Sequence, residues 1–230
     1  VALQNLPVIF AIDRAGIVGE DGLTHQGIFD IAFLRNIPNL IIMAPKDGQE
    51  LEAMLEFALK LDKPVAIRYP RSVIPLSRLP VTPLELGKAE VLKEGKDFAI
   101  IALGSMVIPS LEAIELLEKD GLSGTLINAR FVKPQDSNLF KGILSKVKFI
   151  FCAEEGILEG GFGSAISEAI DKPEGNGLAS FGQSHRQSHK PVIKIGLPAA
   201  FIPHGERDLM LENYGLTAQC IVNKIKSVYA

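Results

Sequence analysis

The stretch that decides the fold is residues 98–128, FAIIALGSMVIPSLEAIELLEKDGLSGTLIN. It begins with an apolar run at 99–103 and ends with a second run at 125–127. Both runs are continuous rather than alternating in hydrophobicity, which is typical of strands buried on both faces. A strand, a helix and a second strand in this order predict a parallel βαβ unit. The helix between the runs is indicated by apolar side chains at helical spacing, at Leu111, Ile114 and Leu117.

The same succession of strands and helices extends over the rest of the chain. One further helix is expected after Asp47, which stands three residues before Glu50 in a capping arrangement. The sequence therefore predicts the α/β class, as two three-layer α/β domains with mostly parallel sheets. Four more continuous apolar runs support this prediction, at residues 8–12, 40–43, 65–67 and 149–152.

Prolines divide the chain into two parts. Residues 72–85 contain several prolines and show no helical period, which favours an extended linker. We therefore expect a truncated first domain at 1–71 and a complete second domain at 86–230. Residues 87–97 are expected to form a hairpin that turns at Glu94-Gly95 and leads into the strand at Phe98. Because the chain lacks an initial Met and its first strand follows almost at once, we expect it to be a fragment of a longer protein.

Composition excludes several classes of function. With 24 Lys and Arg against 27 Asp and Glu, the net charge is −3, so no basic field for nucleic acid is expected. The longest uncharged stretch, residues 98–111, is shorter than the roughly 18–20 apolar residues of a spanning helix, so no membrane insertion is expected. The two cysteines, Cys152 and Cys220, are too few for a disulfide framework. Cys152 is expected to be a buried thiol in a reducing, cytoplasmic compartment.

The densest polar cluster is residues 13–27, DRAGIVGEDGLTHQG, directly after the apolar run 8–12. Ligands of open α/β sheets bind beyond the carboxyl ends of strands, where this loop is expected. Arg14 offers a planar fork suited to phosphate or carboxylate. Asp21 and His25 add an acid and a group that exchanges protons near neutral pH. From spacing alone a solvated loop with an Asp–Arg pair stays an alternative, because the string fits neither the Walker nor the Rossmann pattern.

A family resemblance narrows these alternatives. Residues 13–47 and the string AIRYPRS at 66–72 closely resemble the pyrimidine-binding domain of the 1-deoxy-D-xylulose-5-phosphate synthases, thiamine-diphosphate enzymes of the transketolase superfamily. The strings NARFVKP at 128–134 and FIPHG at 201–205 resemble the C-terminal domain of the same family. The resemblance covers nearly all 230 residues.

The resemblance implies an activity and its cofactors. The family condenses pyruvate with glyceraldehyde 3-phosphate to 1-deoxy-D-xylulose 5-phosphate and CO2, for isoprenoid, thiamine and pyridoxal synthesis. Thiamine diphosphate and Mg2+ bind in a homodimer, mainly on residues expected to lie upstream of Val1, so no cofactor- or metal-binding residue is expected in this chain and the chain alone should be inactive. The implied location is the bacterial cytoplasm, or the plastid stroma of a plant or alga.

The resemblance also implies roles for four residues. Arg14 and Arg71 are expected to hold the phosphate of the acceptor aldehyde. His25 would face the reacting carbon and assist proton transfer or stabilise a developing alkoxide. Asp21 would position substrate hydroxyls or orient His25. The sequence departs from the family at Ala199, where the common GxPD motif loses its aspartate and a local contact is put in doubt.

Two other functions stay open. One is a non-catalytic transketolase-like module that binds a partner subunit, like a β-type subunit of an oxo-acid dehydrogenase. The other is a free-standing phosphosugar-binding protein.

Several further residues are weaker candidates for a site. The glycines of residues 160–164 could cradle an anion at a helix start, although close packing of a helix on a sheet is the favoured interpretation. His185 and His189 have the spacing of a metal pair but stand in a polar loop. His204 is expected to close a turn before a helix. Two strand ends also carry polar groups, with structural roles favoured over ligand binding, at Glu154-Glu155 and Asn128-Ala129-Arg130.

Overall fold

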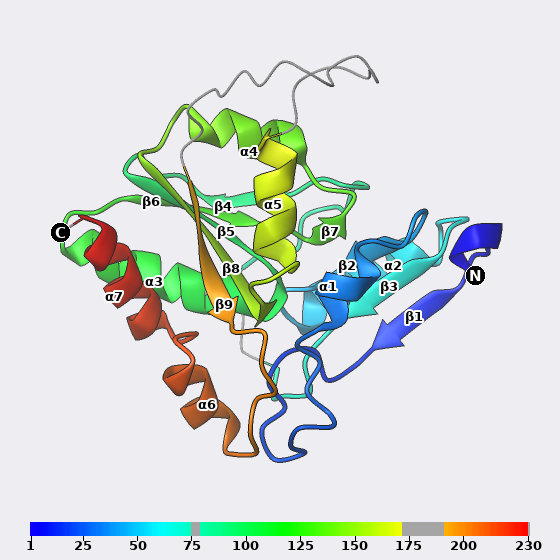
Figure 1. Cartoon of the computed structure of the whole chain (residues 1–230). Coiled ribbons are helices and arrows are strands. Elements are labelled where there is room, and N and C mark those ends of the chain that lie inside the picture. The colour runs from blue at the N-terminus through cyan, green and yellow to red at the C-terminus, as the bar shows by residue number, and fades with distance from the viewer. Residues whose placement is uncertain (75–78, 172–190, 230) are drawn as a thin grey trace, which may run out of the picture.

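The computed structural model describes residues 1–74, 79–171 and 191–229, which form two sheets with flanking helices (Figure 1). Three strands of the first sheet are parallel, and the fourth joins its edge in the antiparallel sense. Its order is β1 (Ile9–Ile12), β3 (Val65–Arg68), β2 (Ile41–Met43) and β7 (Phe131–Lys133).

The second sheet is also parallel except for one edge strand, β4. These two sheets confirm the predicted α/β class with mostly parallel strands. The order of the second sheet is β4 (Glu90–Lys93), β6 (Gly124–Asn128), β5 (Phe98–Ala102), β8 (Phe149–Ile157) and β9 (Val192–Leu197).

Helices connect the parallel strands and cover the sheets. Asp47 begins the first long helix as predicted, because its carboxylate accepts the backbone N–H of Glu50. The α-helices are α1 (Asp30–Leu34), α2 (Gly48–Ala58), α3 (Val107–Lys119), α4 (Ser137–Leu144), α5 (Phe162–Asp171), α6 (Arg207–Asn213) and α7 (Ala218–Tyr229), and short 3-10 turns are η1 (Ala2–Gln4) and η2 (Gly104–Met106). None of the helices within the described ranges has the length and apolar character needed to cross a bilayer.

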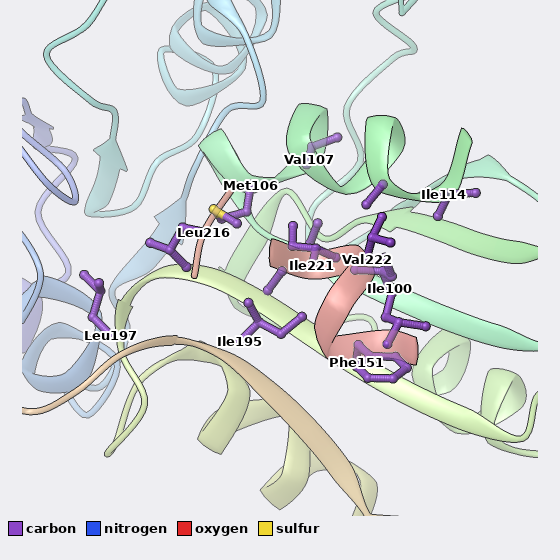
Figure 2. Packing of buried hydrophobic residues seen from close by; sticks show 14 of the residues in the cluster. Ile100, Met106, Val107, Ile114, Phe151, Ile195, Leu197, Leu216, Ile221 and Val222 are labelled. Atoms are coloured by element: carbon purple, nitrogen blue, oxygen red, sulfur yellow. The ribbon is translucent and has the colours of Figure 1, made fainter. Parts of the chain in front are cut away.

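Strand β5 shows why its residues are apolar without interruption. Successive side chains of a strand point to opposite faces of the sheet. Phe98 and Ile100 therefore pack on the side of α3 and α7, whereas Ala99 and Ile101 pack on the side of α4 and α5. Figure 2 shows the first of these cores, in which Ile100 lies among side chains of both helices. Because both faces of this sheet are covered by helices, every residue of the strand is apolar, and this continuous apolar run is what predicted the strand.

Two expectations are wrong. The hairpin at Glu94-Gly95 does not form, because β4 pairs with β6 and not with β5, whose two sides are taken by β6 and β8. Strand β1 is not buried on both faces: it lies at the edge of its sheet, and the side chain of Phe10 is 40% exposed.

Candidate functional site

The loop 13–27 lies at the carboxyl ends of β1 and β3. These two strands are parallel neighbours, with Ile12 opposite Arg68. Arg14 follows the end of β1 and Arg71 follows the end of β3, so the two guanidinium groups emerge at the same edge of the sheet. The loop closes on itself at its base, where Gly27 donates a 2.9 Å hydrogen bond to the carbonyl oxygen of Arg14.

Three of the predicted site residues form one ion-pair cluster. The Nε of Arg14 lies 3.1 Å from Oδ2 of Asp21, and Nη1 of Arg71 binds the same oxygen. Arg14 also pairs with Asp13, with a distance of 2.6 Å between Nη1 and Oδ2. Arg14 has a φ of +59°, a left-handed backbone conformation that is uncommon for a non-glycine residue. Two guanidinium groups this close together can bind an anion such as a carboxylate or a phosphate, and in this structure the anion is the carboxylate of Asp21.

The cluster makes a prediction about acid titration. Hydrogen bonds from Arg71 and then Arg14 lower the pKa of the Asp21 carboxyl below its ordinary value of 3.8. A lowered pKa means that the folded state favours the carboxylate, so the ion pairs persist at neutral pH and are lost only as the pH falls through the lowered pKa. We expect Arg71→Ala to move the pKa of Asp21 upward toward 3.8, as measured by carbon NMR of the side-chain carboxyl.

Lys63→Ala is the matched control for this prediction. It removes one positive charge just before β3, at the opposite end of that strand from Arg71, and should leave the pKa of Asp21 unchanged. An unchanged Asp21 titration in Arg71→Ala would contradict the cluster.

His25, the fourth predicted residue, lies apart from this cluster. Its side chain is exposed, and within the described part of the chain its ring makes one hydrogen bond, between Nδ1 and Oγ1 of Thr24 at 2.9 Å. Asp21 thus binds the two arginines in this structure and does not orient His25. The catalytic role of His25 stays a prediction.

A cleft of about 620 Å3 opens beside the cluster, a volume typical of small-molecule sites. Asp21 and Arg71 line it, whereas Arg14 and His25 are not among its described lining residues. The opposite wall is formed by the second sheet and its helices, through Ser105, Glu155 and Arg207. The cleft therefore lies between the carboxyl ends of both sheets.

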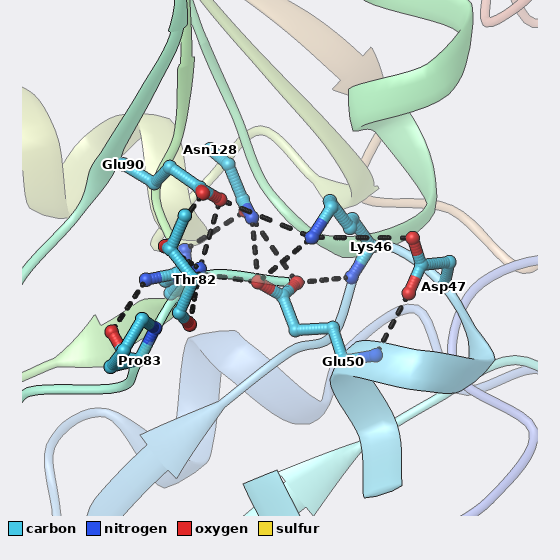
Figure 3. A network of polar contacts seen from close by, with 8 residues as sticks. Lys46, Asp47, Glu50, Thr82, Pro83, Glu90 and Asn128 are labelled. Atoms are coloured by element: carbon cyan, nitrogen blue, oxygen red, sulfur yellow. Dashed lines mark hydrogen bonds and ion pairs between the residues drawn. The ribbon is translucent and has the colours of Figure 1, made fainter. Parts of the chain in front are cut away.

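Asn128 and Arg130 belong to a buried polar network rather than to a ligand site. Arg130 Nε lies 2.9 Å from Oε1 of Glu50, and Asn128 Nδ2 lies 2.9 Å from the same oxygen. Figure 3 shows how Glu50 of α2 also receives the backbone N–H and the ammonium group of Lys46. Glu90 pairs with Arg130 at 2.9 Å. The network joins the first part of the chain to β4 and β6, and protein groups occupy the positions that a ligand would take.

Glu154 and Glu155 do not act as a carboxylate pair. Neighbouring residues of a strand point to opposite faces, and both side chains are buried. Glu154 accepts the backbone N–H groups of Phe162 and Gly163 at 2.7 and 2.8 Å, although burial raises the pKa of its carboxyl. A protein carboxylate therefore occupies the helix start at 160–164, which agrees with the favoured packing interpretation.

The remaining candidates add no chemistry. His185 and His189 lie outside the described residues. His204 is exposed in the turn before α6, as expected, and Ala199 is exposed in the turn after β9, where nothing in the structure explains the lost aspartate. Cys152 is a buried free thiol whose pKa is raised by burial.

Among the described residues, no group of three or more His, Cys, Asp or Glu side chains is placed to hold a metal ion. Helix N-termini often bind diphosphates. Those of α2, α4 and α5 are occupied by the carboxylates of Asp47, Asp136 and Glu154. These three helix starts are therefore not available to a diphosphate.

Comparison with known proteins places the chain in a family. Residues 1–76 match the transketolase pyrimidine-binding domain, and residues 87–221 match the transketolase C-terminal domain. The chain therefore belongs to the transketolase family. It is 45% identical over its whole length to the 1-deoxy-D-xylulose-5-phosphate synthase of Caldanaerobacter subterraneus subsp. tengcongensis, and 46% identical over 98% of its length to that of Natranaerobius thermophilus. The chain spans about a third of these relatives, 35% and 34% of their lengths.

Solved structures agree with this assignment. A split-gene transketolase, described as an inactive tetramer of the "beta4" type, is 31% identical to this chain. Its TM-score is 0.84, over 99% of this chain and 68% of its own. The transketolase of Campylobacter jejuni shares the fold, with a TM-score of 0.73 at 24% identity over 95% of this chain and 31% of its own. These likenesses agree with a transketolase-type fold.

Sequence reasoning missed the contacts that hold the loop 13–27 against the second part of the chain. It gives no role to Arg207 or to Gln26 of the loop, and it considers Glu155 only as half of an acid pair. Gln26 Nε2 donates to the carbonyl oxygen of Ile202 at 2.9 Å, across a large separation in sequence. A local motif does not record such contacts.

Proposed function

We propose that the chain forms the C-terminal part of a thiamine-diphosphate-dependent 1-deoxy-D-xylulose-5-phosphate synthase. The complete enzyme condenses pyruvate with glyceraldehyde 3-phosphate and releases CO2, as a homodimer in the cytoplasm. The observation that carries the proposal is the convergence of Arg14 and Arg71 on one oxygen of Asp21, in a chain that is 45% identical to a synthase. Thiamine diphosphate, which supplies the carbanion chemistry of the reaction, and Mg2+ bind mainly to residues outside this chain.

In this proposal the chain supplies recognition of the acceptor. The two guanidinium groups bind the phosphate of the aldehyde at the mouth of the 620 Å3 cleft. Before the phosphate binds, the carboxylate of Asp21 offsets the repulsion between the guanidinium groups of Arg14 and Arg71. When the phosphate is bound, Asp21 contacts the hydroxyl groups of the aldehyde. His25, exposed at the same loop, faces the reacting carbonyl group and gives a proton to, or stabilises, the alkoxide oxygen that develops as the new C–C bond forms.

The experiment is a chimeric enzyme. This chain is fused to the N-terminal two-thirds of the Caldanaerobacter synthase, where it replaces that protein's own aligned third. We call this fusion the completed enzyme. The completed enzyme is expected to convert both substrates, and the 230-residue chain alone to be inactive. A folded fusion that binds thiamine diphosphate but releases no CO2 from pyruvate would contradict the proposal, with the unmodified relative as positive control.

The acceptor role is tested in the same enzyme. Arg71→Ala should lower kcat/KM for glyceraldehyde 3-phosphate roughly 10- to 150-fold, because a charge-assisted hydrogen bond is lost. This corresponds to a loss of transition-state stabilisation of about 1.5–3 kcal/mol. The KM for pyruvate should stay unchanged. Equal kinetics for the aldehyde in both enzymes would remove Arg71 from the site.

A second candidate is a module that acts only with a separate partner chain. The similarity to one chain of a split-gene transketolase favours it. This candidate would be favoured by two results together. The fusion to the N-terminal part of a synthase would have no synthase activity, and the chain mixed with an N-terminal chain of a transketolase would be active.

A further inference from the structure

The second sheet has a topological switch point that faces the first part of the chain. From β5 the chain continues to β6 on one side, and later to β8 on the other. In such sheets a ligand normally binds in the crevice beyond the carboxyl ends of the two strands that flank the reversal. Here the crevice lies between Ser105, just after β5, and Glu155 of β8.

The loop 13–27 enters this crevice beside the 620 Å3 cleft, whose walls also include Ser105 and Glu155. The carboxylate of Glu155 accepts the backbone N–H of Ile17 at 2.8 Å and the hydroxyl of Ser105 at 2.6 Å. Arg207 pairs with the same carboxylate at 2.8 and 2.9 Å, and its Nε donates to the carbonyl oxygen of Ile17 at 2.9 Å. Both backbone polar groups of Ile17 are thus bound by one ion pair from the second part of the chain.

The fit around this ion pair is close. The side chain of Ile17 is 1% exposed and belongs to the core of the second sheet. Gly16 has a φ of +77°, and a Cβ at this position would lie 2.4 Å from Cδ of Glu155. Further along, a Cβ on Gly19 would lie 2.7 Å from the carbonyl oxygen of Gly205. The loop therefore approaches the second sheet where only glycine fits.

We propose that Glu155 and Arg207 are positioning residues for the acceptor site. They hold Ile17, which stands three residues after Arg14 and four before Asp21, and thereby fix the place of both side chains. We call the binding of both backbone polar groups of Ile17 by Glu155 and Arg207 the clamp. The expected kinetic effect rests on the proposed function, whereas the clamp itself is independent of it.

The first arm of the test uses the 230-residue chain and no activity. Glu155→Gln keeps the size of the side chain and loses its charge, so Arg207 no longer pairs with it. We expect hydrogen exchange of the Ile17 amide, followed by NMR, to accelerate at least about tenfold, with the amides of β5 unchanged. Arg207→Gln is the second variant and should show the same pattern, whereas Arg207→Lys should restore part of the protection.

The matched control is Arg35→Gln. Arg35, directly after α1, pairs with Glu168 of α5 at 2.8 Å and donates to the carbonyl oxygen of Gly160 at 2.6 Å. It thus ties the same two parts of the chain together without touching the loop 13–27. Exchange at Ile17 should stay as in the unmodified chain, because the loss of an ion pair between the parts is not enough to free the loop.

The second arm uses the completed enzyme. Displacement of Arg14 and Asp21 should lower kcat/KM for glyceraldehyde 3-phosphate about 10- to 100-fold in Glu155→Gln, mainly through KM. A purely structural role would instead reduce the amount of active enzyme and leave this KM unchanged. Arg35→Gln should keep the KM of the unmodified enzyme.

The outcomes separate the two proposals. Protection of the Ile17 amide in both Glu155→Gln and Arg207→Gln overturns the clamp. Faster exchange with an unchanged KM overturns the positioning role. Faster exchange in the chain, with no activity in the unmodified completed enzyme, supports the clamp and contradicts the proposed function.

Discussion

Replacing Glu50 with alanine is expected to lower the free energy of unfolding of the chain by about 3–5 kcal/mol, because it breaks a buried ion-pair network. The Glu50 side chain is fully buried, and those of Lys46 and Arg130 are 0% and 3% exposed. Its two oxygens accept hydrogen bonds from Lys46, Asn128 and Arg130. After truncation these buried donors lose an acceptor, so the desolvation cost of each is no longer compensated.

The measurement is urea unfolding of the 230-residue chain, followed by circular dichroism because the sequence contains no tryptophan. Glu56→Ala is the matched control, since Glu56 is an exposed residue of the same helix α2. It should change the free energy of unfolding by less than about 0.5 kcal/mol. If the two variants unfold alike, the network contributes little to the fold and its charges are compensated in another way.

Much of the fold could be predicted from local sequence because each parallel strand needs two covered faces. The run at 99–103 is apolar throughout for this reason, and it became β5. The run at 8–12 misled, because β1 is an edge strand whose Phe10 is 40% exposed. The expected hairpin at Glu94-Gly95 also failed, because strand order depends on pairing between distant segments and not on a turn signal.

The candidate site divides in the same way. Arg14 and Asp21 stand seven residues apart in one loop, so sequence could place them together. The residues that hold this loop are distant: Glu155 binds the backbone N–H of Ile17 across 138 residues, and Arg207 binds its carbonyl oxygen across 190. Candidate site residues can be predicted from the sequence when they stand close together in one loop. The groups that fix their positions become visible only when the chain has folded.

The loop geometry also sets what is expected of His25. The loop is fixed at Ile17 by the Glu155–Arg207 ion pair and at Gln26 by the carbonyl oxygen of Ile202. The exposed imidazole between these two points therefore extends from a held backbone. A positioned group of this kind contributes about 10²- to 10⁴-fold to a proton transfer.

His25→Ala in the completed enzyme is accordingly expected to slow formation of 1-deoxy-D-xylulose 5-phosphate by about 10²- to 10⁴-fold, with the unfolding curve of the chain unchanged. The reason is that the ring makes only the 2.9 Å hydrogen bond to Thr24 among the described residues and supports no buried contact. His204→Ala is the matched control: a Cβ on Gly22 would lie 3.8 Å from Cβ of His204, so this second exposed histidine stands beside the same loop. Its rate should stay within about twofold of the unmodified enzyme. A rate of His25→Ala that also stays within about twofold would remove the proton-transfer role of His25 and leave binding of the phosphate by Arg14 and Arg71 as the contribution of this site.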